Sequence, residues 1–223
     1  IRCGTYLKHS YCYFKRRMIK KMEYQKIETL FERDSNFKVM PDKLKNPAYE
    51  LIKRWQFTEK IDGTNIRIIW QDGKLKLGGR TESAQLPADL LQHIYEIIDT
   101  NKLKEIFSET SAIIYGEGYG AGIQKGGGYS NKKEFAAFDV LVDSKWWLNW
   151  ENTCDIAKKL NLKTVPYLGE FTLEEGISIA KNGFASKLAM SNIQAEGIVG
   201  RTCETLYDKK FNRMIIKLKT RDF

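Results

Sequence analysis

Hydrophobic and polar residues alternate in short runs along the chain from Trp55 onward, as they do in β-strands with one buried face. Between these runs lie stretches whose apolar residues recur every three or four positions, the spacing of an amphipathic helix. The mixture predicts an α+β fold of antiparallel sheets flanked by helices. Strands are expected at residues 57–60, 65–71, 74–78, 112–119, 135–142, 196–203 and 214–218.

Helices are expected at residues 86–99, 150–160 and 173–182. The first has the clearest pattern, because leucine and isoleucine return along one face of it at Leu90, Leu91, Ile94, Ile97 and Ile98. Asp72 and Gly73 stand between two expected strands, and this pair of residues favours a tight hairpin turn.

Size and composition fit one large domain or two small ones. The chain has 223 residues, of which 42% are hydrophobic and 12% aromatic, which is enough to build a packed core. No apolar run approaches the ~18 residues that cross a bilayer, and charges interrupt the first segment where a signal peptide would be apolar. We therefore expect a cytoplasmic protein without membrane contact, and we take it to be a monomer.

The cysteines and histidines do not suggest a zinc site. The four cysteines lie far apart, no CxxC pair occurs, and only two histidines are present. Reduced thiols are the expected state in the cytoplasm.

The formal net charge of +9 is concentrated at the N-terminus. Residues 1–22 contain seven basic residues and no acidic one, which leaves 30 basic against 28 acidic residues in the remainder. Residues 1–21 are therefore interpreted as a basic extension, non-native or disordered, ahead of one domain at residues 22–223. A basic arm that grips RNA is the alternative. Because the domain itself is nearly neutral, local residues must decide whether nucleic acid is a partner.

A lysine before a tight turn is the first candidate for chemistry. The segment Lys60-Ile61-Asp62-Gly63 places an amine at the end of an expected strand, directly before a glycine that permits the turn. Such a segment also arises by chance, so an ordinary exposed lysine stays open on this motif alone.

Further segments follow Lys60 in the order and approximate spacing of the covalent nucleotidyltransferase superfamily of ligases and capping enzymes, which the chain resembles. They are Gly79-Arg80-Thr81, Tyr115-Gly116-Glu117-Gly118, Phe135-Ala136-Ala137-Phe138-Asp139, Ala195-Glu196-Gly197-Ile198-Val199 and Ile216-Lys217-Leu218-Lys219. Within the superfamily, the chain looks closest to the bacteriophage T4 RNA ligase 2 family. Glu59 precedes the lysine, Thr64-Asn65 follows it, and residues 120–125 extend the third motif. The similarity spans about residues 57–219, and it implies a nucleotidyltransferase domain that resembles the ATP-grasping ligases.

The resemblance implies that Lys60 attacks ATP and carries AMP as a covalent lysyl-AMP. AMP then passes to a 5′-phosphate end, and a 3′-hydroxyl displaces it to form a phosphodiester, with RNA preferred and DNA possible. The amine must attack in its neutral form, although an unperturbed lysine has a pKa of ~10.4; a metal, burial and nearby cations would favour that form. Alternation places Lys217 and Lys219 on one face of a strand, where they suit an α-phosphate. A lysine pair kept on an edge strand for solubility is the alternative.

The resemblance also implies a nucleotide site and a metal site. Glu196 is the first choice for holding Mg²⁺ or Mn²⁺, and Asp62 is expected to hold the water ligands of the metal. Glu117 is expected at those waters or at the ribose hydroxyl. Phe138 resembles the residue that stacks on the purine, although it also fits an ordinary core strand. Glu59 resembles the residue that accepts a hydrogen bond from the adenine amino group, which favours ATP over GTP.

Contacts with nucleic acid are expected from Asn65 and Arg80 at the 5′-phosphate, because a guanidinium matches a phosphate with two parallel hydrogen bonds. Arg80 is also counted among the nucleotide-binding residues. Gln124 and Lys125 stand beside a run of three glycines and are expected to touch the RNA strand or the triphosphate. A flexible surface turn is the alternative for this loop.

Other functions stay open on the sequence. Asp62 stands where the phage RNA ligase has histidine, and aspartate there is usual in DNA ligases and in GTP-using capping enzymes, so both are alternatives. A non-catalytic module that binds nucleotide or RNA is a third. No C-terminal OB domain follows Lys219, so the sequence is interpreted as a minimal ligase or a catalytic fragment.

Overall fold

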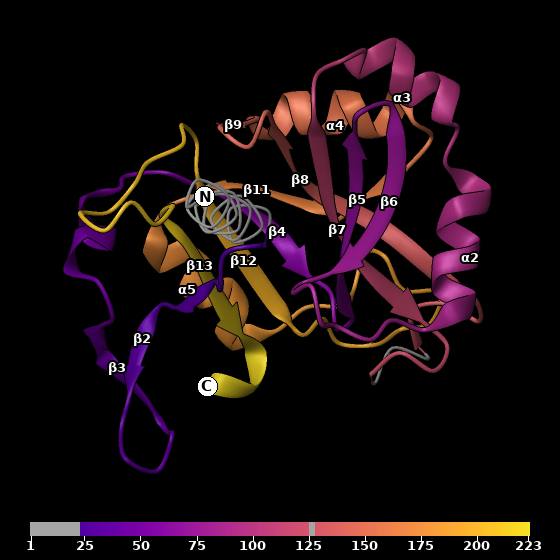
Figure 1. The fold of residues 1–223 in the computed structure, drawn as a ribbon. Helices are drawn as coiled ribbons and strands as arrows, with labels where there is room; N and C mark the ends of the chain where they lie inside the picture. The colour runs from indigo at the N-terminus through magenta and orange to yellow at the C-terminus, as the bar shows by residue number, and fades with distance from the viewer. Residues whose placement is uncertain (1–22, 125–127) are drawn as a thin grey trace, which may run out of the picture.

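Two β-sheets form the centre of the molecule in the computed structural model, which describes residues 23–124 and 128–223 (Figure 1). Most neighbouring strands run antiparallel, whereas β1 with β13 and β10 with β8 are parallel. The first sheet contains, in spatial order, β1 (Glu28–Thr29), β13 (Ile215–Lys219), β12 (Gly197–Thr202), β4 (Trp55–Lys60) and β11 (Tyr167–Phe171). The second contains β10 (Lys163–Thr164), β8 (Lys133–Val142), β7 (Ala112–Gly120), β5 (Thr64–Gln71) and β6 (Lys74–Gly79), with β9 (Trp146–Trp147) paired to β8.

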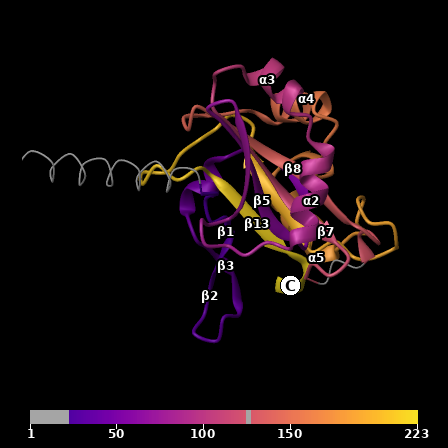
Figure 2. The ribbon, with the colours of Figure 1, turned by 45° about the vertical axis from the view of Figure 1, so that its right-hand side comes forward.

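Helices cover the sheets, and one hairpin stands apart from them. The helices of the described residues are α2 (Ala88–Ile97), α3 (Thr100–Phe107), α4 (Trp150–Lys159) and α5 (Leu173–Asn182), with short 3-10 turns η1 (Pro47–Leu51) and η3 (Thr220–Asp222). Strands β2 (Phe31–Arg33) and β3 (Val39–Leu44) pair with each other and project from the body of the molecule (Figure 2).

Strand alternation divides the buried side chains of the second sheet between its two faces. Ile66 and Ile68 of β5 pack with Leu90 of α2 in a core that also contains side chains of α3 and α4. Ile69 points the other way and belongs to a second core with Tyr115 of β7. The period of two along a strand therefore gives this sheet one face covered by helices and one that faces the first sheet.

The first sheet is divided in the same way. Phe57 of β4, Ile198 of β12 and Ile216 of β13 pack with Ala180 of α5 in a third core. The residues between them point to the opposite face, which is where Lys60 and Lys217 lie. The two sheets thus turn their helix-free faces toward a shared cavity.

The predicted α+β class is confirmed, and every predicted strand is present with its ends shifted by two residues or fewer. Asp72 and Gly73 form the expected turn with positive φ angles of 52° and 66°. None of the helices in the described part of the chain has the length and apolar character needed to span a bilayer. The basic extension predicted at residues 1–21 lies outside the described residues.

The helix predicted at 86–99 is shorter than expected and is followed by a helix that was missed. Helix α2 begins after Pro87 and ends at Ile97, and α3 begins two residues beyond Ile98. Asp99 ends the first pattern because its Oδ1 accepts a hydrogen bond from the Asn101 amide at 2.8 Å and caps α3. The helices at 150–160 and 173–182 are confirmed as α4 and α5.

Candidate active site

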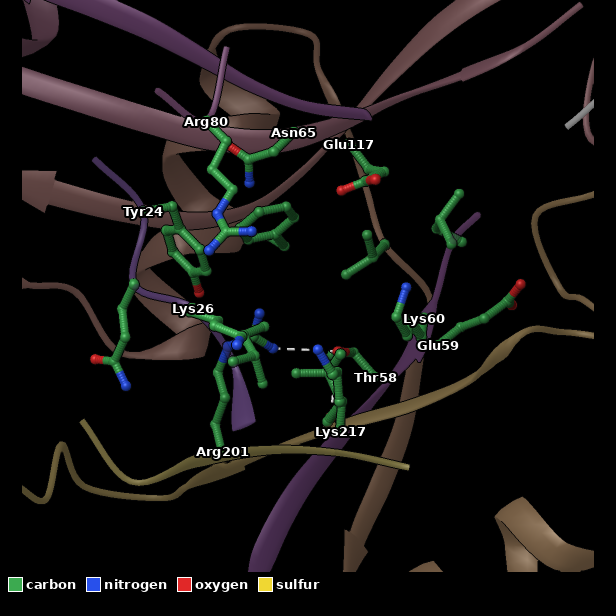
Figure 3. A pocket seen from close by; sticks show the side chains of 16 residues that line it. Tyr24, Lys26, Thr58, Glu59, Lys60, Asn65, Arg80, Glu117, Arg201 and Lys217 are labelled. Atoms are coloured by element: carbon green, nitrogen blue, oxygen red, sulfur yellow. Dashed lines mark hydrogen bonds between the residues drawn. The ribbon is translucent and has the colours of Figure 1, made fainter. Parts of the chain in front are cut away.

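A cavity between the two sheets collects most of the residues that the sequence singled out (Figure 3). Its volume, measured as the space open to the centre of a water-sized sphere, is about 210 Å³, and the cavity opens to solvent. The lining residues are Tyr24, Gln25, Lys26, Ile27, Thr58, Glu59, Lys60, Ile61, Asn65, Arg80, Glu117, Phe138, Val165, Val199, Arg201 and Lys217.

Strand register brings three charged residues together at one end of the first sheet. Gly197 at the start of β12 pairs with Lys60 at the end of β4 and with Lys219 at the end of β13. Glu196 directly precedes this glycine, and its carboxylate accepts hydrogen bonds from the amines of Lys60 and of Lys219, the latter at 2.6 Å. Gly197 has a φ of 153°, and a Cβ there would lie 2.0 Å from the Leu218 carbonyl oxygen. The close approach of the strands therefore requires glycine at this position.

The charges in this cluster alter its acid–base behaviour. Burial by itself raises the pKa of Glu196, but the adjacent charge of Lys60 and hydrogen bonds from Lys219 and Lys60 hold the pKa below its usual value. Burial, followed by repulsion from Lys60 and Lys219, lowers the pKa of Lys217. The cluster thus contains a carboxylate held ionised.

Lys60 and Lys217 both line the cavity, whereas Lys219 reaches the cluster through Glu196. The predicted convergence of Lys60, Glu196, Lys217 and Lys219 is therefore present. The arrangement can offer an amine to an electrophilic phosphorus while fixed cations neutralise charge on the phosphate.

Glu117 and Asp62 add two more carboxylates beside the cluster. Burial, with the neighbouring charges of Glu196 and Asp62, raises the pKa of Glu117 to about 8 against the opposing effect of Lys60. Gly63 is necessary here, because a Cβ on it would lie 2.3 Å from the Gly118 carbonyl oxygen. Within residues 23–124 and 128–223, no group of three or more His, Cys, Asp or Glu side chains is arranged to hold a metal ion.

An aromatic corner forms the opposite end of the cavity. The rings of Tyr24 and Phe138 meet edge to face with centroids 5.0 Å apart, and the guanidinium of Arg201 lies 6.0 Å from the centre of the Phe138 ring. The Tyr24 hydroxyl donates to Asp139 Oδ2 at 2.8 Å, and Arg213 pairs with the same oxygen at 2.7 Å. Burial and then the charge of Asp139 raise the pKa of Tyr24. Phe138 is 9% exposed, so it both packs in the core and reaches the cavity.

Asn65 and Arg80 lie side by side at the upper rim of the cavity in Figure 3, and the side chain of Arg80 extends into it past Tyr24. Asn65 is on β5, and its Oδ1 is buried without a hydrogen-bond partner among the described residues. Arg80 directly follows the end of β6 and is exposed. Both predicted phosphate contacts therefore line the same cavity as Lys60.

Glu59 is among the residues that line the cavity, but its carboxylate is not directed into it. It lies one residue from Lys60 on β4, so its side chain points to the other face, and Figure 3 shows it directed away from the cavity. Its carboxylate accepts hydrogen bonds from the Ser186 hydroxyl and from the Lys187 amide, the latter at 2.8 Å. The carboxylate is thus occupied by the chain itself, and the contact with adenine stays a prediction.

Gln124 is exposed, has a positive φ of 48°, and does not line the cavity. Lys125 lies outside the described residues. Contacts of this loop with RNA or triphosphate therefore stay predictions.

Sequence reasoning missed several cavity residues. Tyr24, Lys26 and Ile27 come from the segment before β1, far from Lys60 in sequence, and no pattern marks that segment as part of a site. Arg201 had a signal, because it lies two residues after Val199 on the same strand and alternation turns both side chains to one face. Its guanidinium donates to the Thr58 hydroxyl at 3.1 Å.

Comparison with known proteins identifies relatives of this arrangement. Residues 53–219 match the model of the family described as RNA ligase. A comparison with curated proteins gave no match.

Solved structures of RNA ligases from Naegleria gruberi have a similar fold. A mutant of the Naegleria gruberi RNA ligase R4a without ligand has a TM-score of 0.64 at 20% identity, over 90% of this chain and 56% of that chain. A mutant of a Naegleria gruberi RNA ligase with ATP and Mn has a TM-score of 0.60 at 19% identity, over 89% of this chain and 62% of that chain. A mutant with AMP and Mn has a TM-score of 0.64 at 20% identity, over 88% of this chain and 60% of that chain. At these identities the likeness shows the fold alone, and the chain spans about three-fifths of the length of those proteins.

Proposed function

The chain belongs to the RNA ligase family, and from this premise we propose that it is an ATP-dependent ligase that seals RNA through a covalent lysyl-AMP at Lys60. The observation that carries the proposal is the cluster of Lys60, Glu196, Lys217 and Lys219 at one end of the cavity that both sheets line. A non-catalytic binding module would not need a lysine held between a carboxylate and other cations, since burying charges is costly.

In the proposed first step, the Lys60 amine attacks the α-phosphorus of ATP. A nitrogen–phosphorus bond forms, the bond from phosphorus to the bridging oxygen breaks, pyrophosphate leaves, and the amine loses a proton. Glu196 accepts hydrogen bonds from Lys60 and Lys219 and so orients the amine. Lys217 lines the cavity beside Lys60, where a fixed cation stabilises charge that builds on the phosphate.

We propose that a divalent metal binds at this end of the cavity, held by two carboxylates and by water rather than by a full set of protein ligands. Burial, together with the charges of Glu196 and Asp62, raises the pKa of Glu117 to about 8, and a cation bound nearby would favour its ionised form. Glu196 and Asp62 are the proposed holders of Mg²⁺ or Mn²⁺, which usually keeps several water ligands. When bound, the metal neutralises phosphate charge and disfavours the protonated amine. The Naegleria gruberi ligase structures with ATP and Mn, and with AMP and Mn, support this proposal.

We assign the base of the nucleotide to the aromatic corner. Phe138 offers a ring face for stacking, and Val199 and Ile27 line the same cavity. Glu117 lines the same cavity and is proposed to bind the ribose hydroxyl. Glu59 is proposed to favour adenine over guanine, through its backbone or after release of its carboxylate from Ser186.

The later steps are assigned to the rim. Arg80 and Asn65 are proposed to bind the 5′-phosphate of the strand that receives AMP, since both side chains line the cavity that holds the proposed lysyl-AMP. Gln124 and Lys125 are proposed to touch the strand beyond it. A 3′-hydroxyl then displaces AMP and forms the phosphodiester. A cytoplasmic location and a monomeric state belong to the same proposal.

The test is self-labelling with α-³²P-ATP and, in parallel, α-³²P-GTP in the presence of Mg²⁺ or Mn²⁺. We expect covalent label from ATP that Lys60→Ala abolishes. Lys53→Ala is the matched control, because Lys53 is an exposed lysine just before the other end of β4. Label from GTP alone would favour a capping enzyme, and absence of label with either nucleotide would contradict the proposal.

A comparison of RNA and DNA substrates then shows which nucleic acid the protein seals. The protein is given 5′-phosphorylated nicks in duplex RNA and in duplex DNA of the same sequence. We expect faster sealing of the RNA nick, whereas faster sealing of DNA would assign the chain as a DNA ligase.

A further inference from the structure

A buried arginine lies behind the rim of the cavity. Arg67 is on β5, two residues after Asn65, and is 1% exposed. Its Nε donates a hydrogen bond to the Gly79 carbonyl oxygen at 2.6 Å, and its Nη2 donates to Glu82 Oε1 at 2.9 Å. A cation is rarely this deeply buried unless it is paired and hydrogen-bonded.

The two bonds fall on either side of Arg80. Gly79 is the last residue of β6, and residues 80–82 leave the sheet as a turn in which the Ala84 amide donates to the Thr81 carbonyl at 3.2 Å. Arg80 itself is exposed. Bonds from Arg67 to the residue before it and to a residue just after it therefore fix the segment from which its side chain reaches the cavity.

The neighbouring strand leaves room for this contact. Gly78 lies opposite Arg67 in the pairing of β5 with β6, and a Cβ on Gly78 would lie 3.0 Å from Arg67 Nη2. A Cβ on Gly79 would lie 2.5 Å from Ala84 Cβ, so the turn folds tightly against the end of the strand. The two glycines allow the guanidinium and the turn to pack together.

We propose that Arg67 is a positioning residue, which presents Arg80 to the substrate phosphate by fixing residues 79–82. This inference depends on the proposed function in one respect, namely that Arg80 binds a phosphate of the substrate. The buried charge contributes little net stability, since an apolar side chain of similar size often replaces a buried ion pair at little cost. Its contribution is to the geometry of the rim, where a displacement of about 1 Å can cost ~100-fold in rate.

A double-mutant cycle tests the proposal. Rates of self-labelling and of RNA nick sealing are measured for wild type, Arg67→Met, Arg80→Ala and the double variant. If Arg67 acts through Arg80, Arg67→Met slows the wild-type protein on the order of 10-fold in at least one of these steps and has no further effect in the Arg80→Ala protein. The proposal would be overturned if, in both steps, the double variant were slowed by the product of the two single effects. Such a result would show that Arg67 acts independently of Arg80.

Two further variants separate positioning from stability. Arg67→Lys keeps a cation and should restore part of the rate, and Glu82→Ala removes one anchor from an exposed residue and should reproduce a smaller form of the defect. Lys76→Met, on the exposed surface of β6, is the control for loss of a cation from the sheet. Each rate is measured at least ~10 °C below the unfolding midpoint of that variant, so that a loss of folded protein is not read as a loss of rate.

Hydrogen exchange gives a readout that does not depend on activity. Arg67→Met should speed amide exchange in residues 79–84, including the Ala84 amide, while leaving β7 and β8 unchanged. Unchanged exchange in residues 79–84 would refute the anchoring even if the rates fall. Failure of the proposed function appears instead as absence of label in the wild-type protein, which this exchange measurement does not affect.

Discussion

The two ends of the cavity are built in different ways. At one end, Lys60, Glu196 and Lys219 meet because three adjacent strands place them in register at Gly197. At the other end, Tyr24 comes from an irregular segment and is held by its hydroxyl bond to Asp139. A site fixed by backbone pairing tolerates the loss of one side chain, whereas a site fixed by side-chain bonds depends on each of them. Mutations at the first end should therefore reduce activity without unfolding, and mutations at the second should reduce stability as well.

The largest effect on the rate of labelling is expected from the lysines of the first end. Lys217→Ala and Lys219→Ala should each slow self-labelling on the order of 100-fold, because a preorganised cation at a phosphoryl group typically contributes about that much. Their unfolding midpoints should stay within a few degrees of wild type, since the strand pairing is unchanged. A near wild-type labelling rate in both variants would show that the lysines do not act at the phosphate.

The largest effect on stability is expected from Asp139, which joins Tyr24 and Arg213. Asp139→Asn leaves the buried guanidinium of Arg213 without its carboxylate, and breaking a buried ion pair of this kind typically costs ~3–5 kcal/mol of stability. Urea unfolding measures the loss, and the apparent KM for ATP in self-labelling should rise in the folded fraction. A stable variant with unchanged KM would remove the distinction between the two ends.

Glu117, beside the lysine cluster, should make the stability of the protein depend on pH. Its pKa is raised from 4.5 to about 8 in the folded protein, so the folded state binds more protons than the unfolded state between these pH values. Stability therefore falls as pH rises from about 4.5 to about 8, by an amount on the order of 4–5 kcal/mol that this group contributes. Glu117→Gln should flatten that slope when unfolding is followed at several pH values in chelator-containing buffer. The same slope in both proteins would show that Glu117 is not its source.

The smallest effect is expected from the hydroxyl of Tyr24. Tyr24→Phe keeps the ring against Phe138 and keeps the pair of Asp139 with Arg213, so the cost should be about 1 kcal/mol. The KM for ATP should rise only a few-fold. Tyr95→Phe, on an exposed residue of α2, is the matched control and should change neither quantity. A loss as large as that of Asp139→Asn would show that the hydroxyl itself organises the corner.

The end of the cavity that contains Lys60 could be predicted from the sequence, because paired strands form it. The motif lysine at a strand end, the carboxylate before β12 and the alternating lysines of β13 could be placed together because strand alternation and motif order constrain them. Helix α2 could be predicted from its apolar period, although the cap at Asp99 was missed and with it α3.

The rest could not be predicted, because it depends on contacts between residues far apart in the chain. The Tyr24 hydroxyl donates a hydrogen bond to Asp139, 115 positions away, and the sequence around Tyr24 contains no pattern that predicts this partner. Glu59 shows that a neighbour in sequence can also be misplaced, because alternation on β4 turns its side chain to the face opposite that of Lys60. Its bonds to Ser186 and Lys187 depend on where a distant loop packs.

The most direct test of the central claim locates the covalent nucleotide. The protein is incubated with ATP and Mg²⁺, digested, and its peptides are analysed by mass spectrometry under conditions that preserve an acid-labile nitrogen–phosphorus bond. The account predicts one added AMP on Lys60 and unmodified peptides containing Lys217 and Lys219. AMP found on a different lysine, or on no residue while ATP is consumed, would contradict it.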